Sequence, residues 1–324
     1  GAFKIKQSPL NVFPEFSPTQ VIIQTESPGF SSNLVETLVS KPIENAISGT
    51  IGIKQIRSQS IPGLSVVTVI FEDESDILMN RQLISEKLST LSSLLPSSII
   101  PTITPLTSSA SSVLGIGLTS ETKNLSELRT IAETIIIPQL MSVPGVADVN
   151  KFGGLVKQFQ VEIDPKKLYQ HQITIKQILE AIKRSSSVQG GGFIENENQR
   201  IIINAEGQTR TIEELSDAPI INLNNKTFRI KDVANVKDGF APSISAVSIN
   251  GVPGVYLSIQ GQLGSDTYKL TQQLDDSLQS ILPILNKDDV KLFPDLFKPA
   301  NFIDASIAGL KFDIIIGAIL VISI

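Results

Sequence analysis

Residues 20–29 read Gln-Val-Ile-Ile-Gln-Thr-Glu-Ser-Pro-Gly, a β-branched run that ends in a Pro-Gly turn. This pattern predicts a strand followed by a reversal of the chain. Asn33 and Glu36 then have the spacing of a helix-capping box, and apolar residues continue at helical spacing to about Ile47. The sequence therefore predicts a strand that leads through a turn into an amphipathic helix.

A hairpin and a second helix complete this unit. Pro62-Gly63 separates two strand-like runs, 53–60 and 64–71, and a helical pattern covers 76–93. Short alternating units of this kind place helices on one face of a small antiparallel sheet. The predicted unit is a split β-α-β sandwich of the ferredoxin-like kind.

The same order of elements recurs further along the chain. The predicted elements of the second copy are a strand at 113–119, a helix from Asn124 and Glu127 to Met141, strands at 146–150 and 156–163, a strand at 255–261 and a helix at 266–285. The turns Gly63-Leu64 and Gly154-Leu155 are 91 residues apart, and Pro42 and Pro138 lie late in the equivalent helices. This internal repeat is too long for a solenoid unit and predicts a second sandwich.

Residues 186–250 interrupt the second copy. Short strand-like runs at 200–205, 227–230 and 246–249 surround a short helix that Thr211 and Glu214 could cap. We expect an inserted α+β subdomain there. The fold class is therefore α+β, with two ferredoxin-like sandwiches, the second of which carries the insertion.

The C-terminal residues 314–324 read Ile-Ile-Ile-Gly-Ala-Ile-Leu-Val-Ile-Ser-Ile, without a charge. A helix of this length would cross roughly half of the ~30 Å hydrocarbon layer of a membrane. We interpret the run as the start of a transmembrane helix; a strand or a core helix is the alternative. The N-terminus has no basic start followed by an apolar run, so no signal peptide is predicted.

Composition excludes several classes of function. The net charge of −5 argues against a nucleic-acid binder, which needs a basic face. The 324 residues include no cysteine and one histidine, which excludes zinc ribbons and thiol catalysis. No Gly-x-Ser-x-Gly motif is present and no catalytic constellation is visible, so an enzyme is not expected. Asp148 and Asn150 follow a Pro-Gly turn and could contact a cation; strand-end hydrogen bonding is the simpler alternative.

Several segments closely resemble the first periplasmic loop of RND efflux pumps, most of all the heavy-metal (CusA/CzcA-like) branch. They are Asn11-Val-Phe-Pro-Glu-Phe-Ser-Pro18, Val21-Ile-Ile-Gln-Thr-Glu-Ser-Pro-Gly29, Val39-Ser-Lys-Pro-Ile-Glu44, Ile56-Arg-Ser58, Gly63-Leu-Ser-Val-Val-Thr68, Val143-Pro-Gly-Val-Ala-Asp-Val-Asn150, Phe152-Gly-Gly154, Val161-Glu-Ile-Asp-Pro165 and Ile230-Lys-Asp-Val-Ala234. The resemblance covers residues 8–324, in order.

The resemblance implies a proton-driven antiporter of the bacterial inner membrane that exports cations. It implies a homotrimer that works with a periplasmic adaptor protein and an outer-membrane channel, with this chain as the periplasmic part between the first and second membrane helices. It implies no cofactor other than a transported metal cation. The implied subdomains are a linker after the first membrane helix (1–17), porter subdomain 1 (18–107), porter subdomain 2 (108–163 and 252–300), a docking subdomain (164–251), and a linker with the start of the second membrane helix (301–324).

The resemblance also places candidate residues in the transport path. Asp148 and Phe152 correspond to cleft-lining positions, and Val113 and Ile116 would lie on the same cleft. Zinc-type relatives carry an acidic residue at the start of this strand, whereas this chain has Ser111-Ser112-Val113-Leu114. The exported ion therefore cannot be named. Connections at 105–112 and 164–168 are the expected hinges.

Two other functions stay open. An RND pump for organic solutes would have apolar, carboxylate-free cleft strands, as Val113, Ile116 and Phe152 suggest. A free-standing periplasmic binding or interaction module would instead pack the apolar C-terminus into its own core.

Overall fold

The structure is a computed structural model that describes residues 17–91, 95–96, 99–186, 193–196, 199–202, 211–221, 226–243 and 245–323. The chain divides into two compact units. Unit 1 comprises Gly1–Lys123, Ile131–Phe152 and Ile249–Ile324, and unit 2 comprises Asn124–Thr130 and Gly153–Ser248. The predicted linker at 1–17 lies almost wholly outside the described residues.

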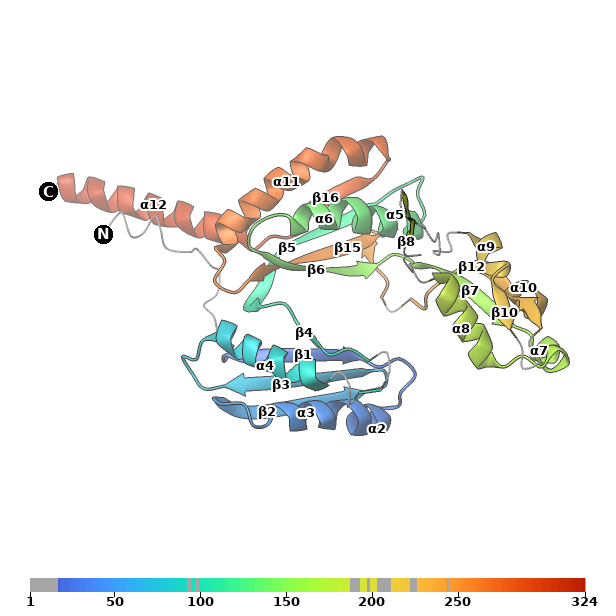
Figure 1. Cartoon of the computed structure of the whole chain (residues 1–324). Coiled ribbons are helices and arrows are strands. Elements are labelled where there is room, and N and C mark those ends of the chain that lie inside the picture. The colour runs from blue at the N-terminus through green and yellow to red at the C-terminus, as the bar shows by residue number, and fades with distance from the viewer. Residues whose placement is uncertain are drawn as a thin grey trace. The chain divides into compact units, whose positions relative to one another are not determined.

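The first sandwich has the predicted order of elements (Figure 1). Its elements are β1 (Gln20–Glu26), α2 (Ser32–Val35), η1 (Glu36–Ser40), α3 (Lys41–Ile47), β2 (Ile53–Ile61), β3 (Leu64–Phe71), α4 (Ile77–Leu91) and β4 (Thr102–Ile103). The strands are antiparallel neighbours in the order β2-β3-β1-β4, which is the ferredoxin-like order. Alternate residues of β1 and β3, among them Ile23 and Val67, are fully buried against the helices.

The second sandwich has the same order of strands, although its parts are far apart in the sequence. Its elements are β5 (Thr107–Thr119), η2 (Ala132–Ile136), α6 (Ile137–Met141), β6 (Val146–Gly153), β15 (Val255–Gln262), α11 (Thr267–Lys287) and β16 (Lys291–Phe297), with α5 (Leu125–Ile131) leading into η2. The sheet order is β16-β5-β15-β6. The fold-class prediction of two ferredoxin-like sandwiches, one of them interrupted, is confirmed.

Both sandwiches carry a π-helical turn immediately before a proline. Lys41 donates its backbone N–H to the carbonyl of Glu36, and Ile137 donates to Ala132, each five residues back. Pro42 and Pro138 follow directly, and neither has an N–H to continue the regular pattern. The wider turn lets each helix continue past its proline.

Unit 2 contains the insertion, with its own core. Its elements are β7 (Lys157–Ile163), α7 (Pro165–His171), α8 (Ile175–Ser186), β8 (Phe193–Asn196), β9 (Gln199–Ile202), α9 (Ile212–Ser216), β10 (Pro219–Ile221), β11 (Thr227–Arg229), α10 (Ile230–Val233) and β12 (Ala234–Phe240). Ile178, Ile220, Ile230 and Val233 are fully buried in it. A short ladder of β13 (Ser248–Ile249) and β14 (Val252–Pro253) follows.

One predicted hairpin is wrong. The run at 156–163 was expected to pair with 146–150, but β7 pairs antiparallel with β12, from Ile163 opposite Ala234 to Lys157 opposite Phe240. The neighbour of β6 is instead β15. Gly153 and Gly154 do turn the chain, with φ values of 73° and 74°, but they lead into the insertion. The strand at 157–163 therefore belongs with the inserted unit and not with the second sandwich.

Other local predictions had mixed outcomes. The first helix is capped by the Ser31 side chain and not by Asn33, whereas the capping box of Asn124 and Glu127 is confirmed. The expected hinge at 164–168 lies in a hydrogen-bonded segment, because Asp164 caps α7 and its N–H bonds the carbonyl of Val233. The hinge at 105–112 is largely strand, since Thr107 and Ser112 pair with β15.

The C-terminal run is helical, as predicted: α12 extends over Ala300–Ser323. Within the described part of the chain, no helix is both long and apolar enough to cross a membrane.

Candidate functional site

The sheet of the second sandwich has two different faces. In the β5–β15 register, Ile116 lies opposite Leu257, and both side chains are fully buried. Gly115 lies opposite Ser258, one step along the pleat and therefore on the other face. The first face packs against α11, whose Leu270 lies beside β15 at Gly261. We call the second face, which carries Gly115 and Ser258, the open face.

A β-bulge at Val113 brings polar side chains to the open face. Leu114 pairs with Ile259 and Ser112 pairs with Gln260, so Val113 is the extra residue on β5. The bulge reverses the alternation, which sends Val113 into the core and Ser112 to the open face. The hydroxyl oxygens of Ser112 and Ser258 are 3.1 Å apart. Gln260 donates from Nε2 to Ser258 Oγ at 2.8 Å, which completes a small polar cluster.

Two glycines of β5 make room for large side chains beside this cluster. A Cβ atom at Gly115 would overlap the phenol oxygen of Tyr256 and would lie 2.9 Å from Phe297 Cβ. A Cβ atom at Gly117 would lie 2.6 Å from a methyl carbon of Leu296. Glycine at these positions is therefore required for the aromatic part of the open face.

β6 adds the predicted residues to the same face. The ring of Phe152 lies 6.1 Å from that of Tyr256, so Phe152 belongs to the open face. Asp148 and Asn150 are an even number of residues from Phe152 on β6, so the alternation of the strand places all three on the same face. Lys151 lies on the opposite face and pairs with Glu133 of η2 at 2.7 Å. The structure thus brings three of the five predicted site residues into one row.

The other two predicted residues lie elsewhere. Val113 is 2% exposed and Ile116 is 0% exposed, and both side chains belong to the core. Neither reaches the surface, so their predicted place in a substrate cleft has no support in this structure. The reason is the bulge together with the alternation of β5, which turns both side chains toward the helices.

The cation-binding prediction for Asp148 and Asn150 stays a prediction. One carboxylate oxygen of Asp148 accepts the backbone N–H of Val149 at 2.8 Å. Within the residues that the structure describes, no group of three or more His, Cys, Asp or Glu side chains could hold a metal ion. The residues of the open face named above offer hydroxyl, amide and aromatic groups, with the Asp148 carboxylate at the edge.

The residues that the sequence analysis missed are Tyr256, Ser258 and Gln260. Their strand pairs with β5, which is 146 residues away at the Ser112–Ser258 contact, so local patterns could not join them. A usable signal was present in Gly115 and Gly117, because two glycines on one face of a strand indicate a bulky neighbour.

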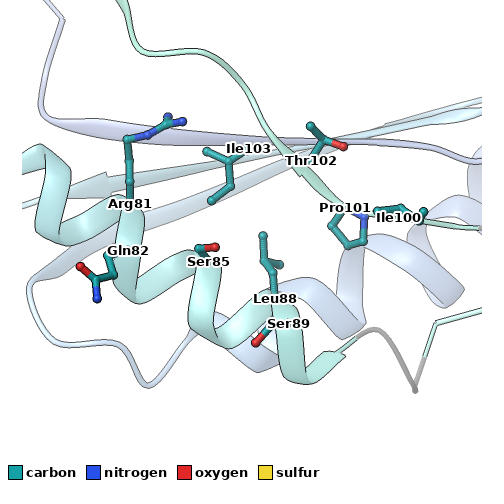
Figure 2. A pocket seen from close by; sticks show the side chains of 9 residues that line it. All are labelled: Arg81, Gln82, Ser85, Leu88, Ser89, Ile100, Pro101, Thr102 and Ile103. Carbon is teal, nitrogen blue, oxygen red and sulfur yellow. The ribbon is translucent and has the colours of Figure 1, made fainter.

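A groove lies on the first sandwich (Figure 2). It has a volume of about 610 Å³ and lies between α4 and the segment that contains β4. Its lining is mixed: Arg81, Gln82, Ser85, Leu88, Ser89, Ile100, Pro101, Thr102 and Ile103. Arg81 is fixed at its end, where it donates to the carbonyl of Thr104 at 2.8 Å. None of the described residues that line the groove carries a carboxylate, and Ile100 is 75% exposed at its rim.

Comparison with known proteins decides the family. The sequence profile described as the AcrB/AcrD/AcrF family matches residues 1–324. The chain belongs to this family. The resemblance to RND pumps of the heavy-metal branch is confirmed.

Several relatives are similar to this chain over nearly its whole length. Protein HelA of Legionella pneumophila is 30% identical over 99% of this chain. The cobalt-zinc-cadmium resistance protein CzcA of Cupriavidus metallidurans is 27% identical over 100%. The crystal structure of a heavy metal efflux pump matches 95% of the chain with a TM-score of 0.81 and 27% identity. The chain spans about 31% of the length of each of these proteins.

Proposed function

We propose that this chain is the periplasmic part, between the first and second membrane helices, of a proton-driven exporter of heavy-metal cations in the bacterial inner membrane. In this proposal the complete protein is a homotrimer that works with a periplasmic adaptor protein and an outer-membrane channel. The observation that carries the proposal is the match of both sandwiches and the insertion, in order, to a heavy metal efflux pump. We also propose that the two sandwiches act as porter subdomains and that the insertion acts as a docking subdomain.

The open face would be one wall of the transport path. Its neutral oxygens, from Ser112, Ser258 and Gln260, can contact a cation without holding it tightly. Weak contacts suit transport, because an ion that binds must also leave. Asp148 would add one negative charge at the edge of this wall. In this proposal no resident cofactor is required, and the metal cation is the substrate.

A second function is favoured by the aromatic part of the open face. The ring pair of Phe152 and Tyr256 resembles the wall of a site for an organic solute. An RND pump for organic solutes would use the same sandwich with a different substrate. A free-standing binding module has less support, because α12 exposes Phe302 and Leu310, at 67% and 61%, and does not pack them into a core.

Growth of an exporter-deficient bacterium tests these alternatives. The complete gene would be expressed, and resistance to zinc, cobalt, cadmium, nickel, copper and silver salts compared with resistance to dyes and detergents. We expect increased resistance to at least one metal and none to the organic compounds. Resistance to organic compounds alone would overturn the proposal.

The substitution Phe152→Ala sharpens the test. For a metal exporter we expect less than a twofold change in metal tolerance, since an aromatic ring is not a metal ligand of choice. For an organic-solute exporter the same change should lower tolerance by about tenfold. Phe302→Ala is a matched control, because that ring is 67% exposed on α12 and belongs to no strand of the sheet.

A further inference from the structure

The base of α12 is held to α11 by two polar links. Lys298 Nζ lies 2.7 Å from an Asp275 carboxylate oxygen. The phenol of Tyr268 donates a hydrogen bond to the carboxylate of Asp304. Tyr268 and Asp275 are seven residues apart, which places them two turns apart on one face of α11. Lys298 and Asp304 bracket the first turns of α12.

The two links make the contact antiparallel. The earlier residue on α11, Tyr268, meets the later residue on α12, Asp304. The later residue on α11, Asp275, meets Lys298, which precedes α12. Between the two links, Ala300 and Ile303 are 3% and 8% exposed. Polar contacts therefore flank a small apolar contact on both sides.

The ion pair is better shielded than most ion pairs of this chain. The Lys298 and Asp275 side chains are 21% and 34% exposed, compared with 59% and 76% for the Lys54–Asp73 pair. Shielding from water strengthens an ion pair relative to an exposed one. The hydrogen bond with Asp304 also raises the pKa of Tyr268, and the nearby negative charge adds to this effect.

Beyond these turns, side chains of α12 become exposed. Leu310 and Ile316 are 61% and 41% exposed, and Figure 1 shows α12 continuing away from the sandwich to which α11 belongs. Among the α12 side chains that the structure describes, the contact with α11 lies at the base of the helix, over residues 298–304.

We propose that Lys298–Asp275 and Tyr268–Asp304 form a clasp that joins the base of α12 to α11, so that α12 and the second sandwich move as one body. Its part in transport rests on the proposed function, in which α12 continues into the second membrane helix. Movement of that helix would then displace the open face directly, because α11 packs on the other side of the same sheet. Lys298, Asp275, Tyr268 and Asp304 are positioning residues and contact no substrate.

Hydrogen exchange on this chain tests the clasp independently of transport. The variant Lys298→Met/Tyr268→Phe keeps the size of both side chains and removes both links. We expect the backbone amides at 303–308 to exchange at least tenfold faster, while those of β5 change less than twofold. The charge swap Lys298→Asp/Asp275→Lys should retain protection within threefold of the unmodified chain. Unchanged protection at 303–308 in the double variant would overturn the clasp.

Lys123→Ala provides a matched control. It removes a lysine that lies 4.0 Å from Asp288, at the C-terminal end of α11 and away from both links of the clasp in the sequence. Protection at 303–308 should stay within twofold. Equal loss in this control would mean general loosening of the sandwich and would also overturn the clasp.

Transport by the complete protein tests whether the clasp couples movement of the second membrane helix to the open face. We expect Lys298→Met/Tyr268→Phe to lower the rate of cation export at least tenfold, with the charge swap restoring part of it. Faster hydrogen exchange with an unchanged export rate would overturn this coupling. If the unmodified complete protein exports no cation, the proposed function fails, whereas the exchange experiment still decides the clasp.

Discussion

The phenol of Tyr256 lies directly over the backbone of Gly115, at the place where any other residue would carry its Cβ atom. The two residues belong to the neighbouring strands β5 and β15, which are separated in the sequence by α5, η2, α6, β6 and the insertion. This contact, together with the Ser112–Ser258 hydrogen bond, builds the open face from segments that are far apart in the chain.

Gly115→Ala is therefore expected to disrupt the open face. The added methyl group would collide with Tyr256 and Phe297, and overpacking of this kind costs about 1–3 kcal/mol of stability. Urea unfolding followed by circular dichroism measures the change. Gly309→Ala is the control: nothing lies within 4 Å of its Cβ position in α12, so stability should be equal or higher by up to about 1 kcal/mol. Equal effects of the two substitutions would contradict the packing described for Gly115.

Thr25→Val is expected to stabilise the first sandwich. Thr25 is fully buried on β1, and its hydroxyl has no hydrogen-bond partner among the described residues. Valine has the same shape without the cost of burying an unpaired hydroxyl, so we expect the free energy of unfolding to rise by about 1 kcal/mol. Thermal unfolding of the purified chain provides the measurement.

Ser40→Ala gives the opposite expectation in the same core. Its hydroxyl oxygen lies 2.7 Å from that of Ser60 and 2.8 Å from that of Ser65, so its removal leaves partners unpaired. We expect a loss of about 1–3 kcal/mol. If both substitutions destabilise equally, the Thr25 hydroxyl has a partner in solution.

Lowering the pH should reduce the stability of the inserted unit through protonation of Asp217. Lys231 and Arg229, at 2.6 Å and 2.9 Å, hold the pKa of this carboxyl below its usual range. A carboxyl whose pKa is lower in the folded state than in the unfolded state stabilises the folded state at pH values above the unfolded pKa of about 4. This stabilisation is lost as the pH falls below that value toward the lowered folded-state pKa. The protection factors of the buried amides of Ile220 and Val233, which correct for the intrinsic pH dependence of exchange, should fall less steeply from pH 6 to pH 3 in Asp217→Asn. An identical pH profile in that variant would exclude this contribution.

Local patterns were sufficient for the elements and the fold class. The capping box at Asn124, the turn at Gly63 and the alternation in β1 and β3 each depend on neighbours in the chain. Because the same local order occurs twice, it predicts the same sheet order twice.

Pairing across the insertion could not be predicted from the sequence. The residues of β7 have the same alternation whether their partner is β6 or β12, so periodicity does not choose between the two. The bulge at Val113 changes the site itself, because one extra residue on β5 places Ser112 on the open face and Val113 in the core. Asp148, Asn150 and Phe152 lie on one face because they alternate along a single strand, β6, while their role in a site stays a prediction.

The most direct test of the proposed function is cation uptake by the complete protein in liposomes. Purified protein would be reconstituted, an inside-acid pH gradient imposed, and the accumulation of zinc, cobalt and cadmium measured together with that of an organic dye. We predict accumulation of at least one of the cations that stops when the gradient is dissipated, and no accumulation of the dye. Accumulation of the dye alone, or cation uptake that is independent of the gradient, would contradict the proposal.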